Sequence, residues 1–200
     1  MTAPRIILAS QSPRRAQLLE ALGLSFETVP ADIDETYLPG EDPVAHAERL
    51  AREKTDAIHR SHPDAVVIGS DTVVIVDGEV LGKPADAADA VRMLMRLQAR
   101  EHEVATGVAV AANGVLRSAV ERVAVRMRRF DEADAAAYAA TGEPLDKAGA
   151  YGIQGRGATL VEGITGDYYA VMGLPICTLI RLLQEAGLHY NFRGVAPRRA

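Results

Sequence analysis

The chain has 200 residues, of which 48% are hydrophobic and 24% charged, and its formal net charge is -5. This length suits one sizeable α/β domain, or at most two small lobes around one core. The negative charge and the 4% aromatic content argue against a nucleic-acid-binding module, which needs a broad basic face and stacking rings. They do not exclude a small phosphate-bearing substrate, because a local cluster of basic side chains can bind one.

Strands and helices alternate in the first half of the sequence. The apolar pattern predicts a strand over 5–9, a helix from Pro13 to Gly23 with Ser12 as its N-cap, a strand over 26–29, a helix over 43–59 and a strand over 65–69 that ends at Ser70-Asp71-Thr72. In the second half it predicts hairpins at Asp77-Gly78 and Asn113-Gly114, helices over 87–97, 131–140 and 175–186, and a strand over 159–164. The order of elements predicts a mixed sheet with helices packed against it.

Cysteine and lysine are both scarce. The single cysteine, Cys177, cannot form an intramolecular disulfide, and its apolar neighbours predict a buried small hydrophobe. Three of the 22 basic residues are lysines, Lys54, Lys83 and Lys147. This scarcity of lysine can arise by chance, and it indicates function only if the three lysines fall in motifs. The apolar run at 6–9 is too short for a signal peptide or a membrane span, so we expect a cytoplasmic location.

The segment Ser10-Gln11-Ser12-Pro13-Arg14-Arg15 lies at a predicted strand-to-helix turn. Such a turn presents backbone N–H groups and the positive end of the helix dipole, which suit an anion. The two hydroxyls and two guanidiniums supply further donors for phosphate oxygens. An ordinary helix start with two surface arginines explains the same residues, and the segment alone does not decide between the two.

Carboxylates follow two of the predicted strands. Asp71 is expected at the C-terminal end of a buried strand, where open α/β sheets bind their ligands. The acidic run Asp32-Ile33-Asp34-Glu35 follows the preceding strand. If these two strand ends are neighbours, the carboxylates converge on a site for Mg²⁺ or Mn²⁺. A helix cap at Asp71 and a solvated loop at 32–35 are the alternatives.

The glycine-rich segment 146–155 is not the interior of a helix or strand. Its composition is typical of a backbone that approaches a ligand closely, although a long surface loop would look the same. The amide of Gln154 offers a donor and an acceptor, as reading a nucleobase edge requires. No His-Glu-x-x-His and no Gly-x-Ser-x-Gly is present, which argues against zinc and serine-nucleophile chemistry.

Taken together, these motifs resemble the Maf family of nucleotide pyrophosphatases. The resemblance covers residues 5 to 187 and rests on six motifs in the family's order: 10–15, Gly69–Val74, Leu81-Gly82-Lys83-Pro84, Thr106-Gly107-Val108, 146–155, and Gly166-Asp167-Tyr168-Tyr169 through Gly173-Leu174-Pro175. It implies an inosine-triphosphatase-like α/β fold, with an elongated twisted sheet, two lobes and a central cleft. It also implies a homodimer, with a single domain over residues 1–188. The family pattern does not explain residues 189–200, which we expect to form a flexible tail because chain ends commonly fray.

The family resemblance also implies an activity, which is hydrolysis of a nucleoside triphosphate to the monophosphate and pyrophosphate with a divalent cation (Mg, Mn or Co). Arg14-Arg15 and the stretch Ala150–Gly155 resemble the branch that acts on dTTP and UTP. Modified pyrimidine nucleotides, a house-cleaning role and a link to cell-division arrest are part of the same expectation. A non-catalytic, nucleotide-sensing regulator of septum formation is the alternative.

The resemblance assigns roles residue by residue. Asp71 matches the proton acceptor, and base selection is assigned to Arg14, Thr72 and Gln154. The polar positions around the phosphates and the metal are matched by Glu35, Lys54 and Lys83, with Ser10, Ser12 and Arg15 beside them. Our hypothesis is that Glu35 holds the metal, either alone or together with Asp71. Asp71 would orient or deprotonate the attacking water. Asp71 cannot easily be both a metal ligand and a free base, and the sequence does not choose.

Overall fold

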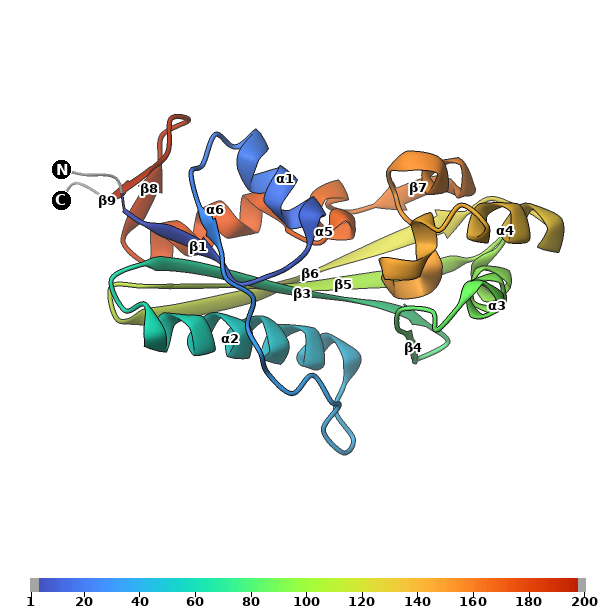
Figure 1. Ribbon diagram of the computed structural model, residues 1–200, viewed down its shortest axis with the longest axis horizontal. Helices are drawn as coiled ribbons and strands as arrows, with labels where there is room; N and C mark the ends of the chain where they lie inside the picture. Colours follow the sequence, from blue (N-terminus) through green and yellow to red (C-terminus); the bar gives the residue numbers. More distant parts are fainter. Residues whose placement is uncertain (1–3, 198–200) are drawn as a thin grey trace. The chain divides into compact units, whose positions relative to one another are not determined.

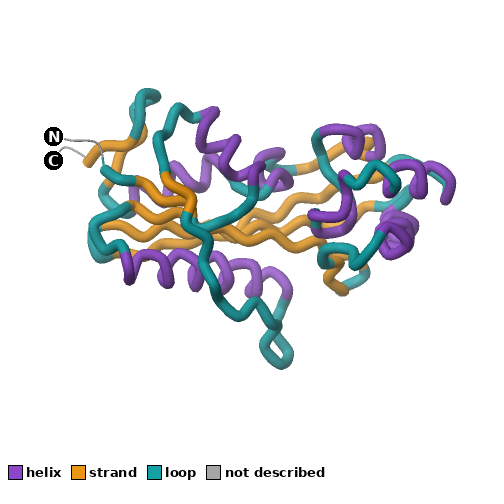
Figure 2. The backbone as a smooth tube through the Cα atoms, in the orientation of Figure 1, coloured by secondary structure: helices purple, strands orange, loops and turns teal. Residues whose placement is uncertain are grey.

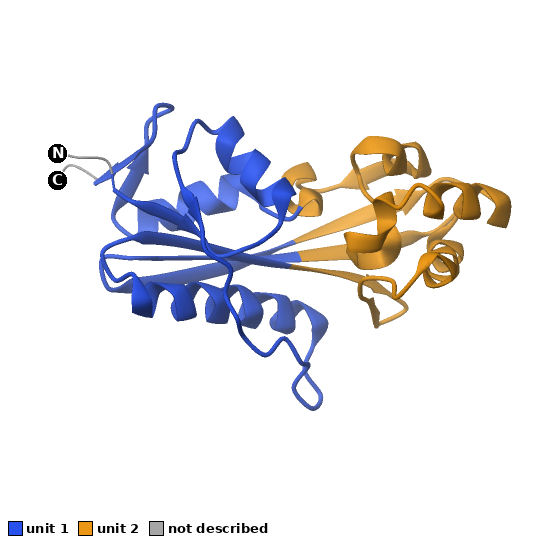
Figure 3. Ribbon diagram, in the orientation of Figure 1, with its two compact units in different colours: residues 1–71, 106–121, 173–200 blue, residues 72–105, 122–172 orange. Residues whose placement is uncertain are grey.

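The computed structural model describes residues 4–197, and the chain divides into two compact units (Figure 3). The first unit comprises residues 4–71, 106–121 and 173–197, and the second comprises residues 72–105 and 122–172.

Figure 1 labels most of the helices and strands. The first part of the chain forms β1 (Ile6–Leu8), α1 (Pro13–Ala21), β2 (Glu27–Thr28), α2 (Pro43–Ser61), β3 (Val66–Val76), β4 (Glu79–Leu81) and α3 (Ala87–Leu97). The rest forms β5 (Glu101–Ala112), β6 (Val115–Met127), α4 (Glu132–Ala139), the 3₁₀ turns η1 (Glu143–Asp146), η2 (Ala148–Ala150) and η3 (Gly155–Leu160), β7 (Val161–Thr165), α5 (Tyr168–Met172), α6 (Ile176–Glu185), β8 (Leu188–Tyr190) and β9 (Val195–Pro197).

Seven strands form one mixed sheet in the order β2-β1-β3-β5-β6-β7, with β4 paired to β3. β1 is parallel to both β2 and β3, whereas β4 and β7 are antiparallel to their partners. Both predicted hairpin turns are present: Asp77 and Gly78, like Asn113 and Gly114, have positive φ values, as a type I′ turn requires. The predicted mixed α/β sheet with flanking helices is therefore confirmed.

The predicted end of the third strand is wrong, because β3 does not stop at Gly69. It continues through Ser70, Asp71 and Thr72 to Val76, so Asp71 stands within the strand. The polar triplet resembles a strand end in the sequence, but pairing with the neighbouring strands of the sheet keeps the backbone extended. β1 pairs with β3 only up to Leu8 opposite Ile68, so this ladder ends three residues before Asp71.

In the first unit, α2 covers one face of the sheet, and α1 and α6 lie on the other face (Figure 1). Two glycines let α2 approach closely. A Cβ at Gly69 would lie 2.3 Å from Thr55 Oγ1, and one at Gly107 would lie 2.3 Å from the carbonyl oxygen of Ala47. Such distances are far below van der Waals contact, so only glycine allows this packing.

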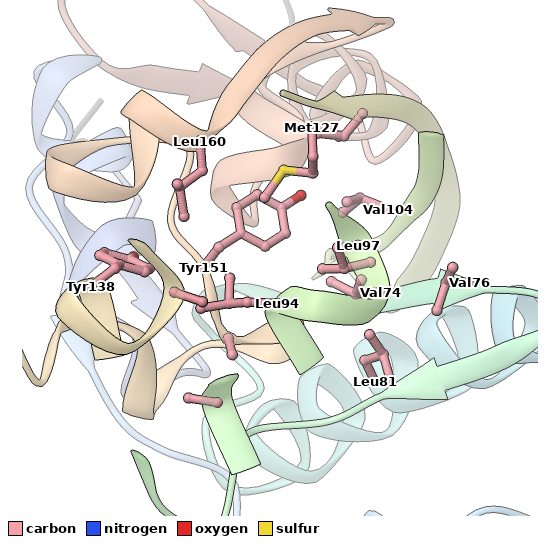
Figure 4. Close-up of a cluster of buried hydrophobic side chains, with 14 of the residues drawn as sticks. Val74, Val76, Leu81, Leu94, Leu97, Val104, Met127, Tyr138, Tyr151 and Leu160 are labelled. Carbon is pink, nitrogen blue, oxygen red and sulfur yellow. The ribbon is translucent and has the colours of Figure 1, made fainter. Parts of the chain in front are cut away.

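The second unit has its own apolar core, which Figure 4 shows in close-up. Leu94 and Leu97 of α3 are fully buried against strand residues such as Val74 and against the rings of Tyr138 and Tyr151. His102 is buried in the same unit, and its Nε2 lies 2.7 Å from the Tyr151 hydroxyl. Burial lowers the pKa of His102 to about 4, because a charged imidazolium is poorly solvated there.

The expectation for Cys177 differs from the structure. Cys177 is exposed in the first turn of α6, because the apolar face of that helix falls on Leu179, Leu182 and Leu183 instead. The segment expected as a flexible tail over 189–200 includes β9 and all of β8 except Leu188, and these two strands pair antiparallel. The Tyr190 hydroxyl donates to the Leu22 carbonyl at 2.7 Å. Residues 198–200 lie outside the described residues, and the flexibility of the tail stays a prediction.

None of the helices in the described part of the chain combines the length and the apolar character needed to cross a membrane.

Candidate active site

Lys54 joins two of the predicted carboxylates in the first unit. It lies on the sheet-facing side of α2 and is only 8% exposed. Its ammonium donates to Asp71 Oδ1 at 2.7 Å and lies 2.8 Å from Glu35 Oε1. A buried ammonium needs such partners, because an unpaired one would lose its hydration without compensation. The structure therefore brings together three predicted residues, the outer two of which are 36 positions apart in the sequence.

The alternation of side chains along β3 explains why Asp71 meets Lys54. Gly69 and Asp71 point to the face of the sheet that α2 covers, because residues two apart in a strand share a face. Gly69 lets the helix approach, so Lys54 can reach Asp71. Ser70 points the other way, and its hydroxyl lies 2.7 Å from the Gly107 carbonyl and 2.8 Å from the Gly173 carbonyl.

Glu35 comes from the loop between β2 and α2, which Figure 2 shows without regular secondary structure. Of the acidic run, Glu35 alone contacts Lys54 among the described residues, since Asp34 accepts the N–H of Thr36 at 2.9 Å and Asp32 is exposed. The expectation that two neighbouring strand ends bring the carboxylates together is wrong, because β1 lies between β2 and β3. The loop itself carries Glu35 to the site.

Arg49 of α2 holds this loop in place, and sequence reasoning missed it. Its Nε donates to Glu41 Oε1 at 2.6 Å and its Nη2 to Glu41 Oε2 at 2.8 Å. Nη2 also donates to the carbonyl of Thr36 at 3.0 Å, directly after Glu35. The hydrogen bonds from Arg49, and those from His46, hold the pKa of Glu41 well below its usual value. The bidentate pair therefore stays charged and fixes the loop on the helix.

An aromatic contact supports the same loop. The Tyr37 ring stacks on His46 with ring centroids 3.5 Å apart and planes 4° apart, and His46 Nδ1 lies 2.8 Å from Glu41 Oε2. Burial, with the nearby charge of Asp71 adding to it, raises the pKa of Tyr37 to about 12. Spacing on α2 places His46 and Arg49 on one face, but nothing in the sequence shows that Glu41 folds back onto them.

The Ser10–Arg15 segment starts α1 as predicted, although its side chains serve the protein's own backbone. Ser12 is the N-cap without a capping side-chain bond, and its N–H donates instead to Ser10 Oγ at 3.2 Å. Arg15 donates from Nε to the Gly173 carbonyl and from Nη1 to Ser10 Oγ, each at 2.9 Å. Burial lowers the pKa of Arg15, and the charge of Asp71 opposes this shift. Arg14 is partly buried on the same helix.

The remaining predicted residues belong to the second unit. Thr72 follows Asp71 in β3 and is partly buried. Lys83 is exposed after β4, and its side chain makes no hydrogen bond or ion pair with residues 4–197. Gln154 is exposed at the N-terminal boundary of η3. The segment expected as one irregular stretch contains η2 and the ends of η1 and η3.

The sequence profile of the Maf-like proteins matches residues 5–186. The chain belongs to the Maf family. Curated members are similar over nearly their whole length: a dTTP/UTP pyrophosphatase of Aquifex aeolicus is 46% identical over 184 residues, covering 92% of this chain and 96% of that protein. A dTTP/UTP pyrophosphatase of Anaeromyxobacter dehalogenans is 50% identical over 189 residues, covering 92% and 95%. The predicted Maf resemblance is thus confirmed.

Solved structures resemble this Maf protein more distantly. A HAM1 protein from Coxiella burnetii has a TM-score of 0.44 at 19% identity and covers 64% of this chain and 74% of its own. Protein VC0702 from Vibrio cholerae has a TM-score of 0.37 at 11% identity and covers 60% and 62%. At these scores the likeness carries no argument about the site.

Proposed function

We propose that this Maf protein is a nucleoside triphosphate pyrophosphatase that hydrolyses dTTP and UTP to the monophosphate and pyrophosphate. The observation that carries the proposal is the ammonium of Lys54 between the carboxylates of Asp71 and Glu35. A sensor that only binds a nucleotide has no need of a carboxylate whose orientation is fixed by a buried ammonium. The similar curated proteins, each a dTTP/UTP pyrophosphatase, support the same substrates.

Asp71 is the proposed base for the attacking water. Its Oδ1 accepts the Lys54 bond, whereas Oδ2 makes no hydrogen bond to residues 4–197. Oδ2 can therefore accept a proton from water while Lys54 fixes the orientation of the carboxylate. The Lys54 ammonium also offsets negative charge, and its own burial strengthens its interaction with Asp71. Lys83 is proposed to act on the phosphates, as the family resemblance implies.

A divalent cation (Mg²⁺, Mn²⁺ or Co²⁺) is the proposed cofactor. Mg²⁺ is commonly bound by one or two carboxylates together with substrate phosphates. Because Asp71 is proposed as the base, Glu35, which is exposed beside the Lys54 ammonium, is the carboxylate proposed to hold the cation. Residues 4–197 contain no group of three or more His, Cys, Asp or Glu side chains that could hold a metal ion. Glu35 would then hold the cation together with substrate phosphates and water, as is common for Mg²⁺. When bound, the cation would neutralise and polarise the phosphate oxygens.

Base selection is proposed to involve Arg14, Thr72 and Gln154, with Ser10, Ser12 and Arg15 supporting the phosphate side. Ser10 and Arg15 would then act by holding the backbone near Gly173, which their hydrogen bonds already do. Modified pyrimidine nucleotides, the house-cleaning role, the cell-division link, the cytoplasmic location and the homodimer stay predictions of the family resemblance.

A panel of triphosphates tests the proposal. Release of pyrophosphate from dTTP, UTP, dCTP, dATP and dGTP should be measured with Mg²⁺, Mn²⁺ and Co²⁺ and with a chelator. We expect the fastest release from dTTP and UTP, and none after chelation. No release from any nucleotide would favour the non-catalytic, nucleotide-sensing regulator of septum formation. Faster release from the purine nucleotides would overturn the assignment of dTTP and UTP as substrates, but the assignment of a pyrophosphatase activity would remain.

A further inference from the structure

The turn that carries Gln154 is held by its backbone. Gln154 is exposed, and its side chain makes no hydrogen bond within residues 4–197. The next residue, Gly155, has a φ of +68°, and a Cβ there would lie 2.9 Å from the carboxylate of Glu143. The position of the Gln154 amide therefore depends on what fixes the main chain on each side of it.

Glu143 fixes the chain after Gln154. Its Oε2 accepts the N–H of Arg156 at 3.0 Å, and its Oε1 accepts the N–H of Gly157 at 2.9 Å. These N–H groups open the 3₁₀ turn η3, whose N-cap residue is Gln154 and has no capping side-chain bond of its own. A carboxylate that accepts two backbone N–H groups makes charge-assisted hydrogen bonds, which are stronger than neutral ones.

Tyr138 fixes the chain before Gln154. Its hydroxyl donates to Glu143 Oε1 at 2.9 Å and accepts the N–H of Gly152 at 3.2 Å. Its ring belongs to the apolar core of the second unit (Figure 4), so the hydroxyl is presented from a rigid base. A Cβ at Gly157 would lie 2.5 Å from this hydroxyl and 2.4 Å from the Gly152 carbonyl, so the turn is closed tightly around it.

We propose that Glu143 and Tyr138 are positioning residues for base selection, which they govern by fixing the backbone on both sides of Gln154. The inference rests on the proposed function and names the part of the second unit that sets its specificity. A pyrimidine presents its pairing edge nearer to its sugar than a purine does. An amide held at one place therefore reaches the pairing edge of dTTP but not that of dGTP. An amide on a loosened turn can move to the pairing edge of either base.

Glu143 does not need to touch the nucleotide for this role. Its carboxylate is fully engaged with the hydroxyl and the two backbone N–H groups. Burial raises its pKa, but the hydrogen bonds from these donors lower the pKa by a larger amount. The pKa therefore lies below its usual value, and the carboxylate is charged at neutral pH. Glu143→Gln keeps the size of the side chain but replaces one carboxylate oxygen by an NH₂ group. One of the two backbone N–H groups then faces a donor and loses its hydrogen bond.

A double-mutant cycle tests the inference, with the ratio of kcat/KM for dTTP to that for dGTP as the readout. We expect Glu143→Gln to lower this ratio about tenfold, and to have no effect on it in a Gln154→Ala background. Tyr138→Phe keeps the ring in the core and should lower the ratio in the same way. Val125→Ala is the control, because it opens the same core and should lower stability without changing the ratio.

The inference is overturned if Glu143→Gln leaves the ratio unchanged, or lowers it equally with and without Gln154. It is also overturned if Gln154→Ala leaves the ratio unchanged while the wild-type protein still releases pyrophosphate, and the proposed function then survives. If the wild type hydrolyses no triphosphate, the proposed function fails instead. In that case the dissociation constants of dTTP and dGTP are measured for the wild type, Glu143→Gln, Gln154→Ala and the double variant. The same ratio of the two constants in all four proteins overturns the inference.

Discussion

Gly69 and Gly107 show how single residues determine which side chains meet. Neither has reactive chemistry, yet each removes a Cβ that would collide with α2. The helix can then approach β3 and β5, which places Lys54 against Asp71. A glycine inside a strand usually weakens the strand, and this loss is the cost of the close contact with α2 that the two glycines permit.

Gly107→Ala should therefore destabilise the protein. The new Cβ would meet the backbone of Ala47, which cannot move like a side-chain end, and overpacking of this kind costs about 1–3 kcal/mol. Urea unfolding measures the loss. Gly163→Ala in β7 is the matched control, since its Cβ would meet only a flexible arginine end at 3.5 Å. Equal stability of the Gly107 and Gly163 variants would contradict the close packing of α2.

At the scale of elements, the loop before α2 depends on the helix that follows it. Arg49 joins Glu41 and the Thr36 carbonyl, so the chain next to Glu35 is fastened to α2. Arg49→Met should lower turnover at least about tenfold, because a small displacement of a reactive group is costly. It should also lower the urea midpoint. Steady-state kinetics and unfolding measure both effects.

Arg60→Met provides the comparison on the same helix. Arg60 pairs with Asp56 four residues earlier, and both side chains are exposed, so the loss of this pair should change little. If the Arg49 and Arg60 variants had the same turnover, the position of the loop that carries Glu35 would not depend on the hydrogen bonds between Arg49 and Glu41.

The elements themselves were largely predictable from the sequence. Asp-Gly and Asn-Gly located both hairpins, and the helical spacing of apolar residues located α2, α3 and α6 close to their observed bounds. The continuation of β3 through Asp71 was not predictable, because local polarity favours a strand end. The strand persists because its neighbours in the sheet hold the backbone extended, which is a tertiary effect.

The candidate site was predictable only in part. Residue types and motifs pointed to Asp71, Glu35 and Lys54, which the structure brings together. Arg49 and Glu143 carried no such signal, because each acts by holding backbone groups of a distant segment. Contacts of this kind depend on how loops fold back, and the periodicity of the sequence does not encode them.

At the scale of the whole molecule, His102 makes stability depend on pH. Burial lowers its pKa from 6.5 to about 4 in the folded protein, so the unfolded chain binds the extra proton first. Stability is therefore present in full above about pH 6.5 and is lost as the pH falls toward 4, by up to roughly 3 kcal/mol. Unfolding free energies of the wild type and His102→Gln should be compared from pH 7 to 4. Parallel curves would contradict a buried neutral histidine.

The account as a whole depends on Asp71 as the group that activates water beside Lys54. The most direct measurement is the rate of pyrophosphate release from dTTP with Mg²⁺ for the wild type, Asp71→Asn and Asp56→Asn, with dTTP binding measured for each. The last variant alters an exposed carboxylate on α2. We predict that Asp71→Asn lowers the rate about a thousandfold and still binds dTTP, while Asp56→Asn behaves as the wild type. A wild-type rate for Asp71→Asn would contradict the account.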